Sequence, residues 1–363
     1  MADHTTGFVA PASVWDSAMR YRKLVILCLL SIDGCIRPRL GFLIPEPDGP
    51  VWPVPPEPAR VRFVGTIQCD LSAASSSPMR GSFQETMQSL LWGPSPSRRL
   101  LTPHAIAVHP DQRRVAIADT NASRVHVIDL PSTKYEEAAP VDEDGAILKT
   151  PVGVVWVGDQ LWIADAGVGA IVKMETASSK SGVLIGKDKL VRPAGVAHDS
   201  ARQRLYVSDA GAHRIVAFDL EGSELYRFGT QGAAPGELNF PAQLSCDPDG
   251  NIVVADALNF RVQRFSPEGR PLGYFGKKGD AAGDFALPKG VATDSLGNIW
   301  VVDSQFENVQ AFDREGRLLL ALGGEGQRAG EFWLPAGATV DRENRLWIAD
   351  TYNRRVQVFQ ILP

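Results

Sequence analysis

Two basic residues, His104 and Lys289, are candidates for acid–base chemistry, because each directly follows a proline that opens a short apolar segment. Six prolines of this kind recur, and the residues after them should occupy equivalent places in the fold. These residues are His104, Val152, Ala194, Ala242, Lys289 and Ala336. A zinc site takes at least three protein ligands, and calcium takes several oxygen ligands. One histidine without a carboxylate therefore predicts no metal site at these positions, and we expect no cofactor.

The other recurring polar residues favour structural roles. An aspartate ends the second apolar segment of every repeat: Asp119, Asp165, Asp209, Asp256, Asp303 and Asp350. Recurrence in all six copies favours a shared turn role, with the carboxylates capping backbone amides, over a ring of charge. The arginines five residues later are expected to partner those turns: Arg124, Arg214, Arg261 and Arg355. Histidines at other places in the repeat are expected to be surface or structural residues: His109, His126, His198 and His213.

The loop after each aspartate varies most between the copies. Large apolar residues occupy it in adjacent repeats, where small residues would suffice: Leu258, Phe260, Phe306 and Tyr352. Aromatic residues are enriched at the centres of protein interfaces. Together with His104 and Lys289, these residues predict a partner-binding face. The alternative is that Phe260 and Phe306 fold back onto the strands.

The elements that must position these residues repeat with a period near 47. The opening prolines stand at 103, 151, 193, 241, 288 and 335. Each begins a short strand, which is followed by a second strand, a third and, in the later copies, a fourth. Six units of four short strands predict an all-β fold over residues 60–363, a six-bladed β-propeller. Neighbouring blades would bury the faces that one small sheet leaves exposed.

Residues near both ends of this region predict how the ring closes. The sixth copy stops at Pro363, just after its third strand, and lacks a fourth. Residues 60–67 resemble the fourth strand at 226–230 and have no preceding strands of their own. We therefore expect this N-terminal strand to complete the last blade. Between it and the first blade, helical spacing of apolar residues at 82–93 predicts a short amphipathic helix that caps one propeller face, or alternatively a partner or membrane helix.

The first 35 residues have the pattern of a bacterial leader. Basic residues at 20–23 precede nine apolar residues, which are too few to span a bilayer, and this arrangement is typical of a secretory signal. Residues 32–35 resemble a lipobox, which predicts lipidation of Cys35, although Asp33 departs from that pattern. An ordinary signal and a chance apolar run are the alternatives. Residues 1–18 are expected to be an over-extended start, because Met19 would place the basic residues at the N-terminus.

Proline dominates the segment after the leader. Eight prolines between Arg37 and Arg60 predict an extended tether over residues 36–59 that holds the domain off a membrane. The alternative is a strap packed along the domain through Trp52.

The repeat pattern P-x-G-[VA]-A-x-D-x-x-G-N-[IL]-[WY]-V-x-D-x-x-N-x-R-V-Q-x-F, clearest in residues 241–360, resembles the NHL repeat. The first two copies depart most: Ala170 replaces the usual basic residue, and residues 131–148 hold a degenerate fourth strand. With its leader, the chain resembles bacterial exported NHL-repeat lipoproteins, which implies the cell envelope, either periplasmic or at the outer membrane. Zinc-dependent lyases and calcium-binding lactonases are similar propellers, but their metal ligands have no counterpart among the residues after the prolines.

Composition excludes one class of partner. The chain has 37 basic and 42 acidic residues and a net charge of −5. It therefore lacks the excess of positive charge that nucleic-acid binding needs. RNA binding, as in animal NHL proteins, is therefore disfavoured. We expect a non-catalytic scaffold that binds another envelope protein or a peptide and meets the membrane only through a lipid anchor. The alternative is a propeller lyase or hydrolase that acts at the channel mouth around His104 and Lys289.

Overall fold

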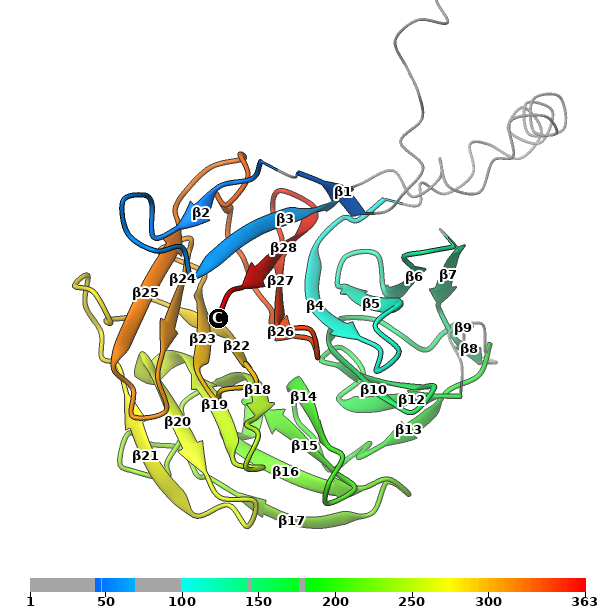
Figure 1. The fold of residues 1–363 in the computed structure, drawn as a ribbon. Helices are drawn as coiled ribbons and strands as arrows, with labels where there is room; N and C mark the ends of the chain where they lie inside the picture. Colours follow the sequence, from blue (N-terminus) through cyan, green and yellow to red (C-terminus); the bar gives the residue numbers. More distant parts are fainter. Residues whose placement is uncertain (1–42, 47, 69–98, 133, 143–144, 176–179) are drawn as a thin grey trace, which may run out of the picture. The chain divides into compact units, whose positions relative to one another are not determined.

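The computed structural model describes residues 43–46, 48–68, 99–132, 134–142, 145–175 and 180–363. In these residues, antiparallel sheets form six blades around a central channel, which confirms the predicted propeller (Figure 1). Strands named in sequence order make the first three blades: β4 (Pro103–Val108), β5 (Arg114–Asp119), β6 (Arg124–Asp129) and β7 (Lys134–Ala138); β10 (Pro151–Val157), β11 (Gln160–Asp165), β12 (Ala170–Met174) and β13 (Val183–Ile185); β14 (Pro193–Asp199), β15 (Arg204–Asp209), β16 (Arg214–Asp219) and β17 (Glu224–Phe228).

Blades four and five follow the same order, and the chain's two ends share blade six. Their strands are β18 (Pro241–Cys246), β19 (Ile252–Asp256), β20 (Arg261–Phe265) and β21 (Pro271–Phe275); β22 (Pro288–Thr293), β23 (Ile299–Asp303), β24 (Asn308–Phe312) and β25 (Leu318–Gly323); β26 (Ala338–Val340), β27 (Arg345–Asp350), β28 (Arg355–Ile361) and β3 (Val61–Gln68). Short elements complete the description: β1 (Leu43–Pro45), β2 (Val51–Trp52), β8 (Val141–Asp142), β9 (Gly145–Ala146) and the 3-10 turns η2 (Ala210–Ala212) and η3 (Ala257–Asn259).

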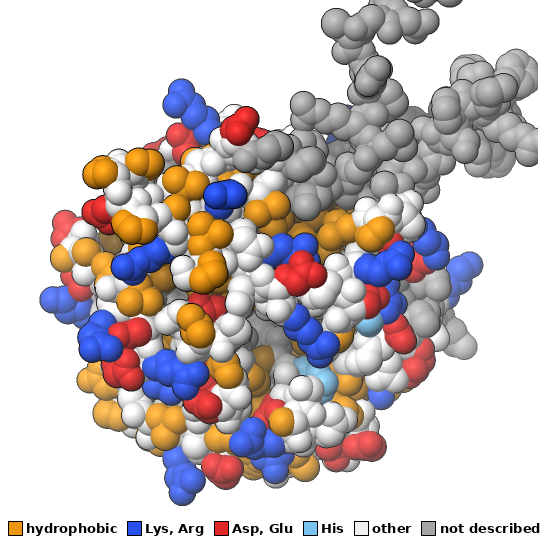
Figure 2. Space-filling view, viewed as in Figure 1, with side chains coloured by type: hydrophobic (Ala, Val, Ile, Leu, Met, Phe, Trp, Pro, Cys, Tyr) orange, Lys and Arg blue, Asp and Glu red, His pale blue; other side chains and the backbone are white. Residues whose placement is uncertain are grey.

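A strand's place in its blade sets its sequence pattern. The second strands β19 and β23 are buried along their whole length, because neighbouring blades cover both faces of the sheet. They are accordingly continuous apolar runs that end in aspartate. The outermost strands β17 and β25 alternate between exposed residues and half-buried or, at Leu322, buried ones, since they meet solvent at the rim. On the face shown in Figure 2, charged side chains of both signs surround the central hollow.

The ring closes as the sequence predicts. Strand β3 pairs antiparallel with β28 and completes blade six, with Phe63 opposite Phe359. The two aromatic rings meet edge to face, with 5.4 Å between their centroids, and both side chains are fully buried. The N–H of Leu362 also donates to the Arg60 carbonyl. In Figure 1 the blue β3 lies beside the red β28.

The structure corrects the predicted tether. Strands β1 and β2 both pair with β3, so the described residues of the proline-rich segment lie along the propeller. The Trp52 ring contacts the Phe359 ring at a centroid distance of 5.7 Å. The contacts of this half-buried tryptophan and the pairing of β1 and β2 with β3 hold the segment against the propeller. This arrangement matches the predicted alternative of a strap. The leader with Cys35 and the predicted helix at 82–93 lie outside the described residues. Within the described residues, no helix is long and apolar enough to cross a membrane.

Candidate functional site

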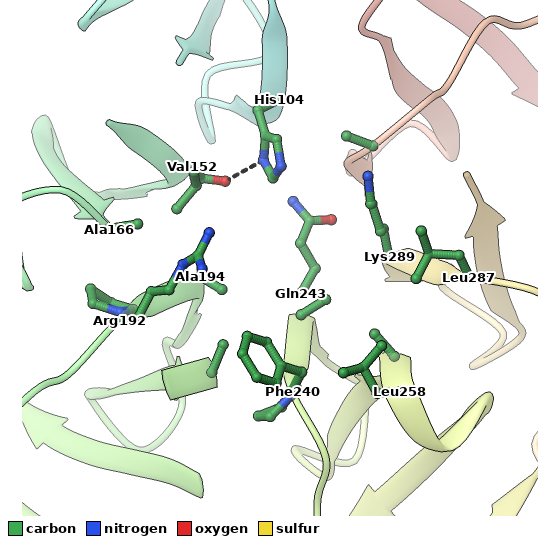
Figure 3. Close-up of a pocket in the computed structure, with 16 residues that line it drawn as sticks. His104, Val152, Ala166, Arg192, Ala194, Phe240, Gln243, Leu258, Leu287 and Lys289 are labelled. Atoms are coloured by element: carbon green, nitrogen blue, oxygen red, sulfur yellow. Dashed lines mark hydrogen bonds between the residues drawn. The ribbon is translucent and has the colours of Figure 1, made fainter. Parts of the chain in front are cut away.

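A recess of about 240 Å³ opens at the channel mouth, the end of the ring where the first strands begin. Polar groups enter it from four blades: His104, Arg192, Gln243 and Lys289 (Figure 3). Phe240, Leu258 and Leu287 form an apolar wall. No Asp or Glu stands among the described residues that line the recess. The mouth is therefore a cationic site with an apolar side.

Bulges in the first strands aim the polar side chains into the channel. In β4 and β22, the pairing register with the second strand breaks directly after the opening proline. His104 and Lys289 are the extra residues at these breaks. A β-bulge leaves one residue unpaired and re-aims its side chain. The same device in β18 falls at Ala242 and Gln243.

The buried aspartates hold the loops that lead into these strands. Asp209 accepts hydrogen bonds from the backbone N–H groups of Val191 and Arg192, at 3.0 and 2.9 Å. Asp303 accepts from Ala286 and Leu287 in the same way. Their predicted structural role is confirmed, but the amides they cap lie before the first strand as well as in the loop after the second. These contacts fix the backbone that carries Arg192 and Leu287 at the mouth.

The predicted arginine partners hold in three blades. Arg214, Arg261 and Arg355 donate to their own aspartates. Arg124 is different, because it pairs with Glu137 at 2.9 Å and buried His126 takes its place beside Asp119.

His104 is a neutral acceptor in the recess. Its Nδ1–H donates to the Val152 carbonyl over 2.8 Å, which leaves the lone pair on Nε2. The pKa of the imidazole is lowered from 6.5 to about 4, mainly by burial. The hydrogen bond to Val152 opposes this shift, and the nearby charge of Lys289 adds to it. The ring is therefore uncharged at neutral pH.

Lys289 has no hydrogen-bond or salt-bridge partner among the described side chains. Burial lowers the pKa of its ammonium group, and the charge of Asp303 opposes that shift. The Asp303 oxygens already accept four backbone N–H groups. The lysine thus faces the recess as a partly desolvated cation.

Gln243 forms the floor. Its Oε1 accepts the backbone N–H of Ala338 across the channel at 3.1 Å, and its Nε2 makes no hydrogen bond within the described structure. A second cavity, of about 220 Å³, lies deeper in the channel and also has Gln243 in its lining. The glutamine side chain therefore separates the two spaces and offers free N–H groups to the upper one.

The apolar wall is held from blades three and four. The N–H of Phe240 donates to His213 Nδ1 at 3.2 Å, and the two rings meet edge to face at a centroid distance of 5.2 Å. Leu258 stands in η3 and is 43% exposed, although its N–H is bonded to the Asn239 carbonyl. A large apolar side chain in a fixed loop but open to solvent is a surface for contact.

The predicted binding residues fall into separate places. His104, Lys289 and Leu258 line the recess together. Phe260 and Phe306 are half-buried and do not line it. Phe260 packs against the core between blades four and five, under the Lys278 ammonium at 5.2 Å, so the fold-back alternative describes it. Tyr352 is 54% exposed and contacts the Trp333 ring instead.

Sequence reasoning missed Arg192, Phe240 and Gln243. The first two directly precede the opening prolines Pro193 and Pro241, and backbone hydrogen bonds to Asp209 and His213 hold them at the mouth. The signal for Gln243 was visible, because four other blades have glycine two residues after the proline. At Gly337 an added Cβ would lie 2.3 Å from the His104 carbonyl oxygen and 2.7 Å from Gln243 Nε2, so the glycine leaves room for the glutamine side chain.

Within the described part of the chain, no group of three or more His, Cys, Asp or Glu side chains could hold a metal ion. The mouth offers the four polar side chains already described. They can bind an anion, and His104 can accept a proton.

Comparisons with known proteins agree with the fold. The family model for the SMP-30/Gluconolactonase/LRE-like region matches residues 143–276, and the NHL repeat model matches residues 332–359. No curated protein matches the chain significantly.

Several solved structures are similar in fold. A streptogramin B lyase is 14% identical, with a TM-score of 0.52 over 72% of this chain and 94% of the lyase. Virginiamycin B lyase from Staphylococcus aureus is 12% identical, with a TM-score of 0.53 over 74% of this chain and 83% of its own. A gluconolactonase from Xanthomonas campestris is 17% identical, with a TM-score of 0.55 over 73% and 89%. Together with the ring of six four-stranded blades, these matches identify the chain as an NHL-like six-bladed β-propeller.

Proposed function

We propose that the propeller is a non-catalytic binding module that holds a protein or peptide at the face around the channel mouth. One observation carries the proposal: the recess combines cations that have no counter-ion among the described lining residues with an exposed apolar wall. Such a pairing of a few polar groups with apolar walls is typical of ligand sites. A propeller fold by itself would not indicate a function.

Apolar residues around the recess support a macromolecular partner. Large hydrophobic side chains are exposed in the loops at this end of the ring: Leu101, Val191, Phe240, Leu258, Trp333 and Tyr352. All six lie either just before a first strand or just after a second strand. Exposed apolar residues gathered on one face favour a contact surface over scattered surface residues.

Selection of peptides against the full chain tests this proposal. Peptides enriched from a random displayed library should lose at least tenfold in affinity for Leu258→Asp. Leu272→Asp is the matched control, since Leu272 is also exposed but lies on the outer strand β21. Equal binding of the enriched peptides to both variants, or no enrichment at all, would overturn the proposal.

A second candidate function is proton-transfer catalysis at the same recess, as a lyase or a hydrolase. It is favoured by the available lone pair on Nε2 of neutral His104 beside the partly desolvated Lys289, since a general base needs a free lone pair within reach of the substrate. Activity assays with gluconolactone and with streptogramin B, which are the compounds that the similar lactonase and lyase are named for, test it. Turnover that disappears in His104→Gln would replace the binding module by an enzyme.

We also propose that the chain is exported and anchored in the bacterial envelope through a lipid on Cys35. The leader pattern in the sequence supports this. Expression of the full chain in a bacterial host should place it in the membrane fraction, with a lipid mass on the mature N-terminus. Cys35→Ser should release it, and a membrane fraction without lipid would contradict the proposal.

A further inference from the structure

We infer that the mouth recess recognises a free carboxylate next to an apolar side chain, as found at the C-terminus of a peptide that ends in a large aliphatic residue. This inference rests on the proposed binding function and adds the chemistry of what is bound. The carboxylate would lie between Lys289 and Gln243, with the side chain of the last residue against Phe240 and Leu258.

Charge complementarity comes first. Arg192 and Lys289 line the recess, and none of the described lining residues is acidic. The nearest aspartates, Asp209 and Asp303, point away into the loops and are occupied by backbone N–H groups. The attraction between opposite charges is stronger in a partly desolvated recess than on an open surface. An anion is therefore the ligand group that this recess lacks.

The hydrogen-bonding groups of the recess favour an anion that has an N–H donor next to it. The Lys289 ammonium and the Gln243 Nε2 group offer N–H donors without partners among the described residues, and Arg192 adds a guanidinium at the rim. Carboxylate oxygens can accept several such bonds at once. His104 Nε2 is the exception, because it is an acceptor. The last backbone N–H of a peptide, which stands beside the terminal carboxylate, matches that acceptor.

Size and depth fit a chain end. A volume of about 240 Å³ is below the ~300–1,000 Å³ typical of sites that enclose a whole drug-sized ligand. The Gln243 side chain reaches into the channel between the recess and the deeper cavity, so a bound chain would leave through the mouth (Figure 3). One terminal residue can enter, and the residues before it would lie along the exposed apolar face.

Fluorescence anisotropy with the full chain tests the inference. The probes are a dye-labelled pentapeptide, Gly-Gly-Ser-Ala-Leu, with a free carboxylate, and the same peptide as its C-terminal amide. We expect the acid to bind at least tenfold more tightly than the amide. Lys289→Met should remove that difference by weakening the acid only. Lys187→Met is the control for loss of one positive charge, because Lys187 is exposed and does not line the recess.

Further arms separate this inference from the proposed function. If the acid and the amide bind equally and Leu258→Asp weakens both, the peptide-binding proposal stands and the carboxylate inference is wrong. Calorimetry with 4-methylpentanoate tests a small free acid as the source of the carboxylate. Binding of this acid, dependent on Lys289, without peptide binding would overturn the peptide as occupant and hence the inference, while the peptide selection above still tests the proposed function. If none of the three probes binds, the inference is overturned, while the peptide selection above still tests the proposed function. Lys289→Met must unfold at the same urea concentration as the native chain for these comparisons to count.

Discussion

At the scale of single residues, one backbone irregularity decides which side chains reach the channel mouth. The bulge after the opening proline turns His104 and Lys289 inward, while the proline before each and the strand after each stay in register. Burial then changes what those side chains can do, because it lowers the pKa of both. The sequence alone identified these two residues but not their neutral and desolvated states, which arise from the other blades around them.

The lowered pKa of His104 should make stability depend on pH. The unfolded chain binds a proton at this residue below pH 6.5, whereas the folded chain binds it only below about pH 4. The unfolded state therefore binds more protons between these values, so stability is lost as the pH falls through that window. At 1.36 kcal/mol per pKa unit, the loss reaches about 3 kcal/mol. Urea unfolding at pH 7 and pH 4 measures it.

The comparison needs a variant that lacks the titrating ring. His104→Gln removes it, so the stability difference between the native chain and the variant should shrink by about 3 kcal/mol on acidification. Carboxylates elsewhere titrate in both proteins and cancel. A difference that does not change with pH would show that the imidazole is not held neutral.

At the scale of elements, the aspartate at the end of a second strand couples three parts of its blade where it also pairs with a side chain of the third strand. Asp350 accepts the Trp333 N–H from the loop before its blade and pairs with buried Arg355 at 2.6 Å on the third strand. The recurrence of these aspartates predicted a turn role. It did not predict that they also anchor the loop before the first strand, since that loop lies 15 or more residues earlier in the chain and the contact exists only after folding.

Removing these carboxylates should cost more where an arginine is buried beside them. Asp350→Asn leaves the Arg355 cation without its counter-ion and should lower the free energy of unfolding by about 3–5 kcal/mol. Asp303→Asn has no arginine partner and loses only hydrogen bonds to backbone N–H groups, which predicts about 1–3 kcal/mol. Urea titrations of both variants check the order. An equal or reversed effect would argue against the buried ion pair as the cause.

At the scale of the whole molecule, all six blades depend on one seam, the pairing of β3 with β28 that closes the ring. Period, strand count and the closing strand all followed from the sequence, because a repeated pattern reports the same local structure six times. The sequence did not predict the path of residues 48–59, because their prolines indicate an extended chain but not what that chain contacts. Gln243 also required the ring, because its partner Ala338 is 95 residues away and across the channel.

Weakening the seam should destabilise all blades together. Phe63→Ala removes a fully buried ring from β3 and should lower the free energy of unfolding by about 3–5 kcal/mol. Far-UV circular dichroism and tryptophan fluorescence should still report one transition, at a lower urea concentration. Leu272→Ala, at an exposed position on β21, should leave the midpoint nearly unchanged. Separate transitions for the two probes would show that the blades unfold independently.

Because β3 pairs with β28, the fold of the ring should not depend on the chain being open in blade six. Val61 lies opposite Ile361, so a short linker could join Pro363 to Arg60 and turn the seam into an ordinary hairpin. New ends could then be cut at the exposed turn around Glu221, between β16 and β17. We expect such a circular permutant to fold with the same six blades, as judged by circular dichroism, and to keep the recess intact. Any blade could then come first in the chain, and we expect every circular permutation of the same segments to form the recess.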